Sequence, residues 1–257
     1  MGSIHPTAII SPKAEIDEGV DIGPYAVIGD KVKVKAGTSI EAHTVIDGDT
    51  YIGKGNEIFP FASIGLKPQD LKYNNEDTKL IIGNNNKIRE FTTIHKGTIE
   101  ANETRIGDNN LFMAYAHVAH DCKIGNNCIL ANCATLAGHV VLGDYITIGG
   151  LTGVHQFVSI GSHSFIGGAS KITQNVLPYL MVSGNESSVH GLNIVGLKRR
   201  NYTSEQIAVL KDAYKTIFKS NYRLEEALEI LSEKYKDSKD IKCIVEFAKK
   251  MERGICR

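Results

Sequence analysis

Residues 124–148 read IGNNCI-LANCAT-LAGHVV-LGDYIT-I, and an aliphatic residue opens each of these six-residue units. The same phase extends back to Ile4 and forward to Ile172, with interruptions at 65–81 and 97–105. A period of six is neither the period of an α-helix nor the alternation of an open sheet. It is typical of a parallel β-solenoid built from hexapeptides, in which three short strands close one coil of about 18 residues.

The period changes after Pro178, which divides the chain into a solenoid at 1–178 and a C-terminal segment at 179–257. In that segment the apolar residues follow a helical spacing, which predicts helices at 203–220, 223–236 and 239–252. The first of them opens with a capping box, Thr203 followed by Gln206. We therefore expect an all-β solenoid with a small α-helical domain, which would cover the open strand edges of the last coil.

Glycine recurs at the second position of the hexapeptides, as at Gly107, Gly125 and Gly143. Glycine tolerates backbone angles that other residues avoid, so we expect it to form the sharp corners of the coil. The interruptions at 65–81 and 97–105 are polar, contain turn-forming residues and keep the phase of six. Both are expected to be loops that project from the solenoid, where repeat proteins commonly carry function.

The composition excludes several classes of function. Lysine and arginine together number 29, as do aspartate and glutamate, so no global charge attracts nucleic acid. No run of about 18 apolar residues is present, and the first residues lack the basic and apolar regions of a secretory signal. We therefore expect a cytoplasmic protein without a membrane span.

The five cysteines form no CxxC pair. Cys122 and Cys128 occupy the fifth position of their hexapeptides, where other repeats have small residues such as Ala134 and Ser164. Free cysteine is among the most frequently buried residue types. We therefore expect these two to be small core residues and not redox groups or metal ligands.

Four of the nine histidines gather on one edge of the predicted solenoid. The remainders on division by 18 lie between 9 and 13 for His117, His120, His139 and His155. Gly138 and Gln156 share the remainder of His120, so the three should form one column. Because coils stack about 5 Å apart, the column brings together residues within about 10 Å that lie far apart in the sequence.

Three interpretations of this column are open from the residues alone. The first is that histidine is merely tolerated at solvent-exposed corners. The second is a metal site, because histidine is the commonest metal ligand. The third is general base catalysis by His120, with Asp121 orienting the imidazole and raising its basicity. Neighbours on a strand point in opposite directions, so contact between His120 and Asp121 requires a corner or another subunit.

Motifs interleaved with the hexapeptides give a more specific indication. They are PQDLKY at 68–73, IRE at 88–90, TIHKG at 93–97, HVAHDC at 117–122, AGHV at 137–140, VHQF at 154–157 and GLKRR at 196–200. Together and in this order they resemble the UDP-N-acetylglucosamine O-acyltransferases of lipid A biosynthesis. Many acyltransferases and nucleotidyltransferases share the hexapeptides alone, whereas this set of motifs covers essentially the whole chain.

The resemblance implies transfer of a (3R)-3-hydroxyacyl group from acyl carrier protein to the 3-position of the glucosamine of UDP-N-acetylglucosamine, the first step of lipid A biosynthesis. It implies a left-handed parallel β-helix that assembles into a homotrimer with active sites between subunits. No metal or other cofactor is expected, because the acyl donor is carried on the phosphopantetheine of the carrier protein.

The resemblance also implies roles for individual residues. His120 is the general base, Asp121 orients it, and the Gly138 N–H stabilises the oxyanion. The residues that hold the sugar and its phosphates are Gln69, Asp70 and Lys72. Further pocket residues are His95, His117, His139, His155 and Gln156. The nucleotide contacts are Asn193, Arg199 and Arg200, and paired arginines suit a diphosphate.

Two positions bear on specificity. Gly168 matches the position at which the family measures acyl length, and glycine leaves the groove open for a long chain of about fourteen carbons or more. Val195 stands where some members have glutamate, which affects one nucleotide or ribose contact and leaves open whether the acceptor is a 3-hydroxyl or a 3-amino group. Two alternatives to the acyltransferase are a zinc-dependent hydratase like the gamma-class carbonic anhydrases and a non-catalytic solenoid that binds a partner.

Overall fold

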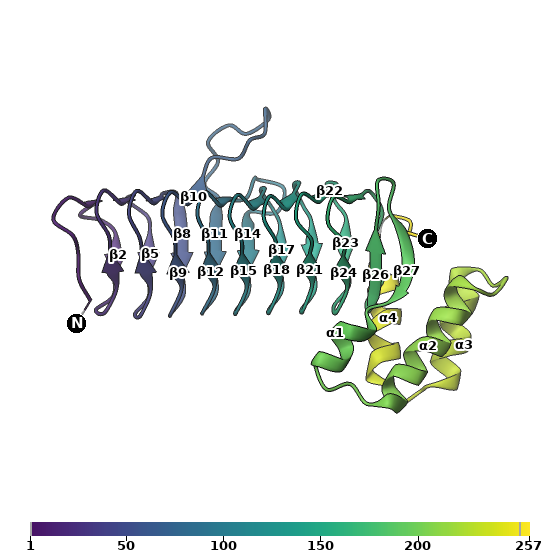
Figure 1. Cartoon of the computed structure of the whole chain (residues 1–257). Helices are drawn as coiled ribbons and strands as arrows, with labels where there is room; N and C mark the ends of the chain where they lie inside the picture. Colours follow the sequence, from purple (N-terminus) through teal and green to yellow (C-terminus); the bar gives the residue numbers. More distant parts are fainter. Residues whose placement is uncertain (1, 252) are drawn as a thin grey trace.

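The computed structural model describes residues 2–251 and 253–257, and it shows a long β-helix with a group of helices at its C-terminal end (Figure 1). Three sheets run along the β-helix as the faces of a prism. The parallel register joins His117 to Thr135 and Val118 to Leu136, so an uninterrupted coil contains 18 residues. This pairing confirms the hexapeptide interpretation.

Each coil contributes one strand to each of three sheets. Sheet A contains β3 (Asp21–Ile22), β6 (Ser39–Ile40), β9 (Glu57–Ile58), β12 (Lys87–Ile88), β15 (Leu111–Phe112), β18 (Ile129–Leu130), β21 (Thr147–Ile148), β24 (Phe165–Ile166), β26 (Leu180–Ser183) and β27 (Ser188–Leu192). Sheet B contains β1 (Ile9–Ile10), β4 (Val27–Ile28), β7 (Val45–Ile46), β10 (Ser63–Leu66), β13 (Thr93–His95), β16 (His117–Val118), β19 (Thr135–Leu136), β22 (Gly153–Val154) and β25 (Lys171–Ile172). Sheet C contains β2 (Glu15–Ile16), β5 (Lys33–Val34), β8 (Asp49–Ile52), β11 (Lys79–Ile82), β14 (Glu103–Ile106), β17 (Lys123–Ile124), β20 (Val141–Leu142) and β23 (Ser159–Ile160).

Three edges join the faces of the prism, and each edge collects the corners of successive coils. Corners at which the chain passes from sheet A to sheet B form the A–B edge. Corners from sheet B to sheet C form the B–C edge, and corners from sheet C to sheet A form the C–A edge. His120 lies on the B–C edge, in the corner between β16 and β17. Residues on the same edge in neighbouring coils therefore lie close together, whereas residues on different edges lie on different sides of the β-helix.

The interior of the β-helix is filled by the aliphatic residues that open the hexapeptides. From Ile22 to Ile172 the residues in this phase are at most 4% exposed. The driving force is burial of apolar surface, and each coil completes the core of the one before it. Cys122 and Cys128 are fully buried in this core, as predicted.

The hexapeptide glycines are required for a different reason from the one predicted. The left-handed backbone angles lie two positions later, for example at Asn127 (φ 57°) and Tyr145 (φ 60°), and not at Gly125 or Gly143. A β-carbon at Gly125 would lie 2.7 Å from the carbonyl oxygen of Gly143 in the next coil. Close approach of neighbouring coils, and not a positive φ, therefore demands glycine there.

Two loops leave the coils, both from the B–C edge. One spans 67–78 between β10 and β11 and stands out from the prism in Figure 1; the other spans 96–102 between β13 and β14. The predicted intervals extended too far, because the chain rejoins sheet C at Lys79 and at Glu103. Both loops therefore project beside the edge that carries His120.

Beyond the last coil the chain forms a hairpin and four helices. The hairpin joins β26 to β27 in antiparallel pairing, which the sequence pattern did not predict. The helices are α1 (Ile194–Arg199), α2 (Ser204–Phe218), α3 (Leu224–Lys234) and α4 (Lys239–Lys249). The last three match the predicted helices to within a few residues, and the capping box of Thr203 and Gln206 is present. Among the described residues, no helix has both the length and the apolar character that crossing a membrane requires.

Candidate active site

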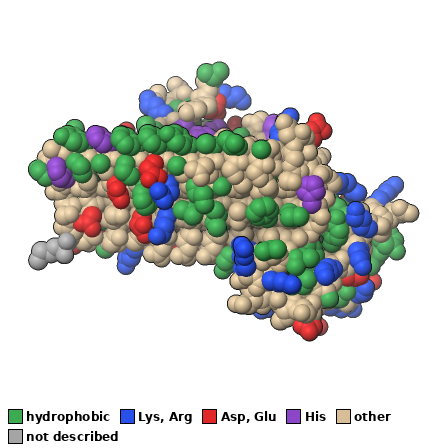
Figure 2. Space-filling view, in the orientation of Figure 1, with side chains coloured by type: hydrophobic (Ala, Val, Ile, Leu, Met, Phe, Trp, Pro, Cys, Tyr) green, Lys and Arg blue, Asp and Glu red, His purple; other side chains and the backbone are tan. Residues whose placement is uncertain are grey.

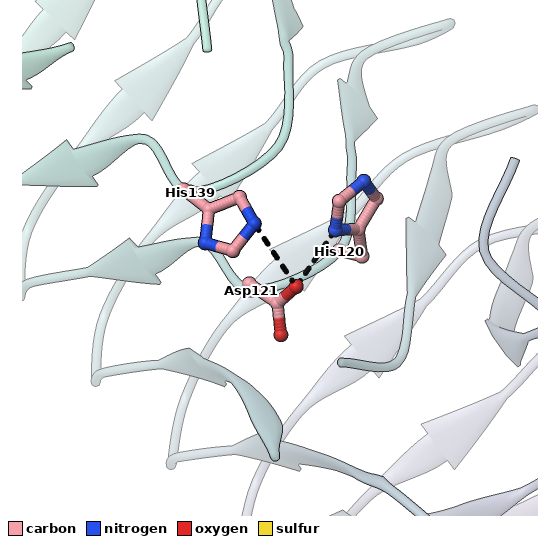
Figure 3. Close-up of side chains that lie close together, drawn as sticks. All are labelled: His120, Asp121 and His139. Carbon is pink, nitrogen blue, oxygen red and sulfur yellow. Dashed lines mark hydrogen bonds and ion pairs between the residues drawn. The ribbon is translucent and has the colours of Figure 1, made fainter. Parts of the chain in front are cut away.

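His120 and Asp121 form a hydrogen-bonded pair on the B–C edge (Figure 3). Asp121 Oδ2 lies 2.7 Å from His120 Nδ1. The side chains of sequence neighbours meet here because Asp121 has a φ of 62°, which turns the chain at the corner. A corner contact within one chain is therefore sufficient for this pair.

Asp121 is held by the 96–102 loop as well as by its own coil. Its Oδ1 accepts a hydrogen bond from the Thr98 N–H at 2.8 Å, and its Oδ2 accepts one from Thr98 Oγ1 at 2.6 Å. The Asp121 N–H donates to Thr104 Oγ1 at 2.8 Å. The Asp121 side chain is fully buried, so these bonds compensate its lost hydration and fix its orientation toward His120.

The pair has the electrostatics of a base and its orienting carboxylate. The hydrogen bond with Asp121 holds the pKa of His120 above its ordinary value despite partial burial, and the nearby charges of Asp70 and Glu100 act in the same direction. Burial raises the pKa of Asp121, but hydrogen bonds from His120 and Thr98 outweigh it and leave that pKa below its ordinary value. Asp121 therefore stays ionised while His120 titrates.

Gly138 lies against the ring of His120 in the next coil. A β-carbon at position 138 would lie 2.6 Å from His120 Cε1 and 2.8 Å from its Nε2. The Gly138 N–H makes no hydrogen bond to any of the described residues. The Gly138 backbone therefore lies against the imidazole, and its N–H, unpaired among the described residues, is the kind of donor that an oxyanion needs.

His139 completes a second contact with Asp121. Its Nε2 lies 3.4 Å from Asp121 Oδ2 and 3.2 Å from Glu100 Oε2. Its ring stacks on Phe157 with centroids 4.4 Å apart and meets the His120 ring edge-on at 5.3 Å. Asp121 thus lies between two imidazoles, both fixed by packing.

His95 and His117 form a second, more buried pair, with His117 in the same coil as His120 and His95 in the coil before it. Their rings meet edge-on at 5.1 Å, and His117 Nδ1 lies 2.6 Å from Thr93 Oγ1. Burial lowers the pKa of His95 to about 4 and also lowers that of His117. His95 Nδ1 is buried without a hydrogen-bond partner among the described residues. Both imidazoles are therefore neutral at pH 7 and available as hydrogen-bonding groups.

His155 and Gln156 extend the column toward the C-terminus. Both are exposed on the single chain, and His155 Nδ1 lies 3.1 Å from the Gln156 carbonyl oxygen. Gly138 and Gln156 lie in successive corners of the same edge, since the Phe157 N–H donates to the Gly138 carbonyl oxygen. The predicted column of His120, Gly138 and Gln156 is therefore present.

The 67–78 loop places Asp70 close enough to His120 for their charges to interact. The carboxylate of Asp70 contributes to the raised pKa of His120. Asp70 Oδ1 also accepts the Lys72 N–H at 2.9 Å, which forms a tight turn. Gln69 and Lys72 are exposed beside it, so their side chains are free to meet a ligand.

The remaining predicted residues lie on the other two edges of the chain. Arg200 lies against the C–A edge, where its Nη2 donates to the Tyr145 carbonyl oxygen at 3.2 Å and its guanidinium covers the Tyr145 ring. Asn193 caps α1 through Gly196 N and donates to the His163 carbonyl oxygen, and Arg199 is exposed nearby. Gly168 lies on the A–B edge, in the corner between β24 and β25. One chain therefore does not bring these residues to His120.

The same side chains satisfy the geometric minimum for a metal site. Ligand atoms of His120, Asp121 and His139 lie within 4.8 Å of one another. A zinc site with three protein ligands uses such a set. In this arrangement, however, His120 Nδ1 faces Asp121 at hydrogen-bond distance, which is also the arrangement of a base and its orienting carboxylate.

Sequence reasoning missed Thr98, Thr104 and Glu100. All three surround Asp121 or His139, and two of them belong to the 96–102 loop. Loop residues have no phase on the solenoid, so the remainder on division by 18 does not locate them. Thr104 precedes Ile106 in β14, and its phase is shared by buried Thr50 and Leu80 in the same sheet.

Comparisons with known proteins agree with the fold and give the family. Residues 175–256 match the family model described as UDP N-acetylglucosamine O-acyltransferase, domain 2, and residues 103–138 match that of the bacterial transferase hexapeptide. The acyl-[acyl-carrier-protein]–UDP-N-acetylglucosamine O-acyltransferase of Burkholderia orbicola is 48% identical over the full length of both chains.

Solved structures give the same result. The UDP-N-acetylglucosamine acyltransferases of Moraxella catarrhalis and Francisella novicida are 42% and 40% identical to the chain, with TM-scores of 0.96 and 0.97. Each comparison covers 99% of this chain and, respectively, 99% and 94% of the other. The fold class is a left-handed parallel β-helix with C-terminal helices. With full-length identity near one half and the same fold throughout, the chain belongs to the acyl-[acyl-carrier-protein]–UDP-N-acetylglucosamine O-acyltransferase family and is an acyltransferase.

Proposed function

We propose that the chain transfers a (3R)-3-hydroxyacyl group from acyl carrier protein to the 3-position of the glucosamine of UDP-N-acetylglucosamine, the first step of lipid A biosynthesis. The observation that carries the proposal is the His120–Asp121 pair, with Gly138 against the imidazole ring. Acyl transfer to a hydroxyl needs a base, a carboxylate that orients it and an amide donor for the oxyanion. Here they lie in two successive corners of the B–C edge.

The proposed reaction is a direct transfer. With Nδ1–H donated to Asp121, His120 Nε2 carries the lone pair and accepts the proton of the sugar 3-hydroxyl. The sugar oxygen attacks the thioester carbonyl, and the Gly138 N–H stabilises the oxyanion. The carbon–sulfur bond then breaks, and the phosphopantetheine thiolate leaves with the proton that His120 returns.

A covalent acyl-cysteine is not part of this proposal. Burial raises the pKa of the Cys122 and Cys128 thiols to about 12, and both side chains are fully enclosed in the core. The thiolate is the nucleophilic form of cysteine, so these two residues are inert. His120 is the general base for the sugar and not for an enzyme nucleophile.

We propose further that the active enzyme is a homotrimer with sites between subunits. His120 lies on the B–C edge, whereas Arg200 lies on the C–A edge. A threefold arrangement in which sheet B of one copy faces sheet A of the next brings these two edges together across each interface. The third edge, A–B, then points at the symmetry axis.

The A–B edge has the surface that such an axis needs. Its corners carry a stack of rings with centroids about 5 Å apart, formed by Tyr25, His43, Phe61, Phe91 and Tyr115. The aromatic members Phe61, Phe91 and Tyr115 remain 43–57% exposed on the single chain, and Leu151 further along the edge is 72% exposed. Figure 2 shows a band of hydrophobic side chains along one edge of the β-helix. A long exposed apolar row of this kind favours contact with other copies of the chain.

Remaining parts of the proposal concern substrates and location. The donor is carried on the phosphopantetheine of acyl carrier protein, no metal or other cofactor takes part, and the reaction takes place in the cytoplasm. Gly168 on the A–B edge sets acyl length, and a β-carbon there would lie 3.2 Å from the Gly150 carbonyl oxygen. The acceptor is the 3-hydroxyl or the corresponding 3-amino group.

A transfer assay tests the proposal directly. The protein is incubated with UDP-N-acetylglucosamine or its 3-amino analogue and with hydroxyacyl carrier proteins of graded chain length. We expect transfer of a long acyl chain, and near-complete loss of transfer in a folded His120→Ala protein. Wild-type activity in that variant would refute the assignment of the base. Stoichiometric zinc bound at the histidines, with activity lost on its removal, would instead support the hydratase-like alternative.

A further inference from the structure

Arg253 reaches the B–C edge from outside the β-helix, at the C-terminal end of the histidine column. Its Nη1 lies 3.3 Å from His155 Nδ1 and 3.4 Å from the Thr173 carbonyl oxygen. Within the described part of the chain, none of the ion pairs includes Arg253. A guanidinium with no carboxylate partner among the described residues therefore lies beside a predicted pocket residue.

The backbone around Arg253 is fixed to the last coil. Asn175 Nδ2 donates to the Arg253 carbonyl oxygen at 2.8 Å, and the Asn175 N–H donates to the Gly254 carbonyl oxygen at 3.0 Å. The Cys256 N–H in turn donates to the Asn175 carbonyl oxygen at 2.8 Å. Asn175 and Cys256 are both at most 1% exposed. The arginine is therefore presented from a backbone that buried hydrogen bonds hold in place.

The distance from the catalytic pair limits what Arg253 can meet. His120 and His155 lie on the same edge two coils apart, which corresponds to about 10 Å. The diphosphate of the acceptor is attached to the sugar ring whose 3-hydroxyl meets His120. The phosphate of the donor is separated from the thioester by the whole pantetheine arm. The distance of about 10 Å between His120 and His155 therefore fits the diphosphate of the acceptor better than the phosphate of the donor.

The height of α1 along the β-helix agrees with this position. Arg200 is bonded to the corner of Tyr145, and Asn193 to the corner of His163, and these corners precede and follow that of His155 along the chain. In a trimer whose axis parallels the β-helix, α1 of a neighbouring copy lies at the level of His155. A sugar nucleotide with its sugar at His120 and its uridine at α1 has its diphosphate between them.

We infer that Arg253 binds the diphosphate of the sugar nucleotide, on the opposite side from Arg199 and Arg200 of a neighbouring copy. The inference rests on the proposed function and adds a binding residue to it. Arginine suits this role because its planar guanidinium donates two parallel hydrogen bonds to phosphate oxygens. The contact with His155 then places an imidazole next to the same phosphate.

The test compares UDP with uridine as ligands of the intact full-length protein. In Arg253→Ala we expect UDP affinity to fall about tenfold or more, because a charge-assisted contact is lost, while uridine affinity is unchanged. Arg253→Lys should fall between, since lysine keeps the charge but not the fork. The matched control is Arg257→Ala, an exposed arginine of the same segment, which should behave as wild type. Thermal melting of each variant establishes that it is folded.

Steady-state transfer assays separate the two sources of phosphate. We expect Arg253→Ala to raise KM for UDP-N-acetylglucosamine and to leave KM for the hydroxyacylated carrier protein unchanged. The inference is overturned if UDP affinity is unchanged. It is also overturned if the variant instead loses the ability to distinguish acyl-phosphopantetheine from acyl-pantetheine, which would assign the arginine to the donor. A wild-type protein that neither binds UDP nor transfers an acyl group would refute the proposed function itself.

Discussion

The imidazole of His120 and the backbone of Gly138 are in contact across two coils, so closely that a β-carbon at 138 would lie 2.6 Å from His120 Cε1. Gly138→Ala should therefore displace the base and block the amide donor at once. We expect kcat to fall by about 10²-fold or more, with the protein still folded. Wild-type kcat in a folded Gly138→Ala protein would contradict the contact.

Asp121 should set the pH dependence of the reaction. Its hydrogen bond holds the pKa of His120 above the ordinary value, and the base must be neutral to accept a proton. The acidic limb of the kcat/KM profile should therefore lie above pH 6.5 in the wild-type protein. In Asp121→Asn the limb should move to lower pH, while the maximal rate falls by about 10²-fold or more because the imidazole is no longer oriented.

A matched variant for that experiment is Glu100→Gln. Glu100 also raises the pKa of His120, but it is 57% exposed and therefore screened. Its removal should move the acidic limb by much less than the removal of Asp121. A larger shift in Glu100→Gln than in Asp121→Asn would show that the buried carboxylate is not the dominant partner of the base.

The row of rings on the A–B edge should control assembly. Tyr115→Asp introduces a charge into an exposed apolar row that the proposed trimer buries, so the assembly should dissociate and activity should be lost. Tyr51→Asp is the control, because Tyr51 is also an exposed tyrosine but lies in β8 on sheet C, away from the proposed interface. Light scattering after size-exclusion chromatography measures the mass of each variant.

Sites shared between copies predict complementation of inactive variants. His120→Ala and Arg199→Ala chains, unfolded and refolded together, should regain activity that neither has alone. With random mixing, about one site in four receives His120 from one chain and Arg199 from the other. Mixed samples no more active than the separate ones would mean that both residues act within a single chain.

His163 should make the fold sensitive to acid. Burial lowers the pKa of His163 to about 4, below the ordinary 6.5 of the unfolded chain. Between these values the unfolded chain binds a proton that the folded chain does not, so the free energy of unfolding falls as the pH is lowered. His163→Phe, which keeps a ring between Tyr145 and Tyr179, should reduce this pH dependence by about 1–3 kcal/mol.

Denaturant unfolding at several pH values measures the effect. His190→Gln is the control, because His190 is exposed on β27. The explanation fails if the two variants lose stability equally between about pH 7 and pH 4.

The solenoid could be predicted from the sequence because its core repeats. A residue such as Val118 is buried for the same reason as Leu136, one coil later, so a single phase locates both. The column of His120, Gly138 and Gln156 follows from that phase. The hairpin of β26 and β27 could not be predicted in this way, since its antiparallel return has no repeat to align. The six residues of α1 are too few to establish a helical period.

The surroundings of Asp121 and the position of Arg253 were beyond the same reasoning. Thr98 reaches Asp121 from a loop, and Arg253 reaches His155 from the end of the chain. Neither residue has a phase relative to the coils. Their contacts depend on where a non-repeating segment happens to fold back, and that is decided by hydrogen bonds such as those of Asn175.

Because of the eighteen-residue register between His117 and Thr135, the position of a residue around the β-helix axis and its height along that axis can be read separately from its number. The residue number modulo eighteen gives the angle around the axis, and the number of completed coils gives the height. Loss of one whole coil between the 67–78 loop and His120 would lower the loop by a single step and leave it facing the same way. Loss of a single hexapeptide would instead rotate the loop to a neighbouring edge and carry Asp70 away from the catalytic pair. An insertion or deletion between the loop and His120 therefore keeps the loop on the same edge only if its length is a whole number of coils.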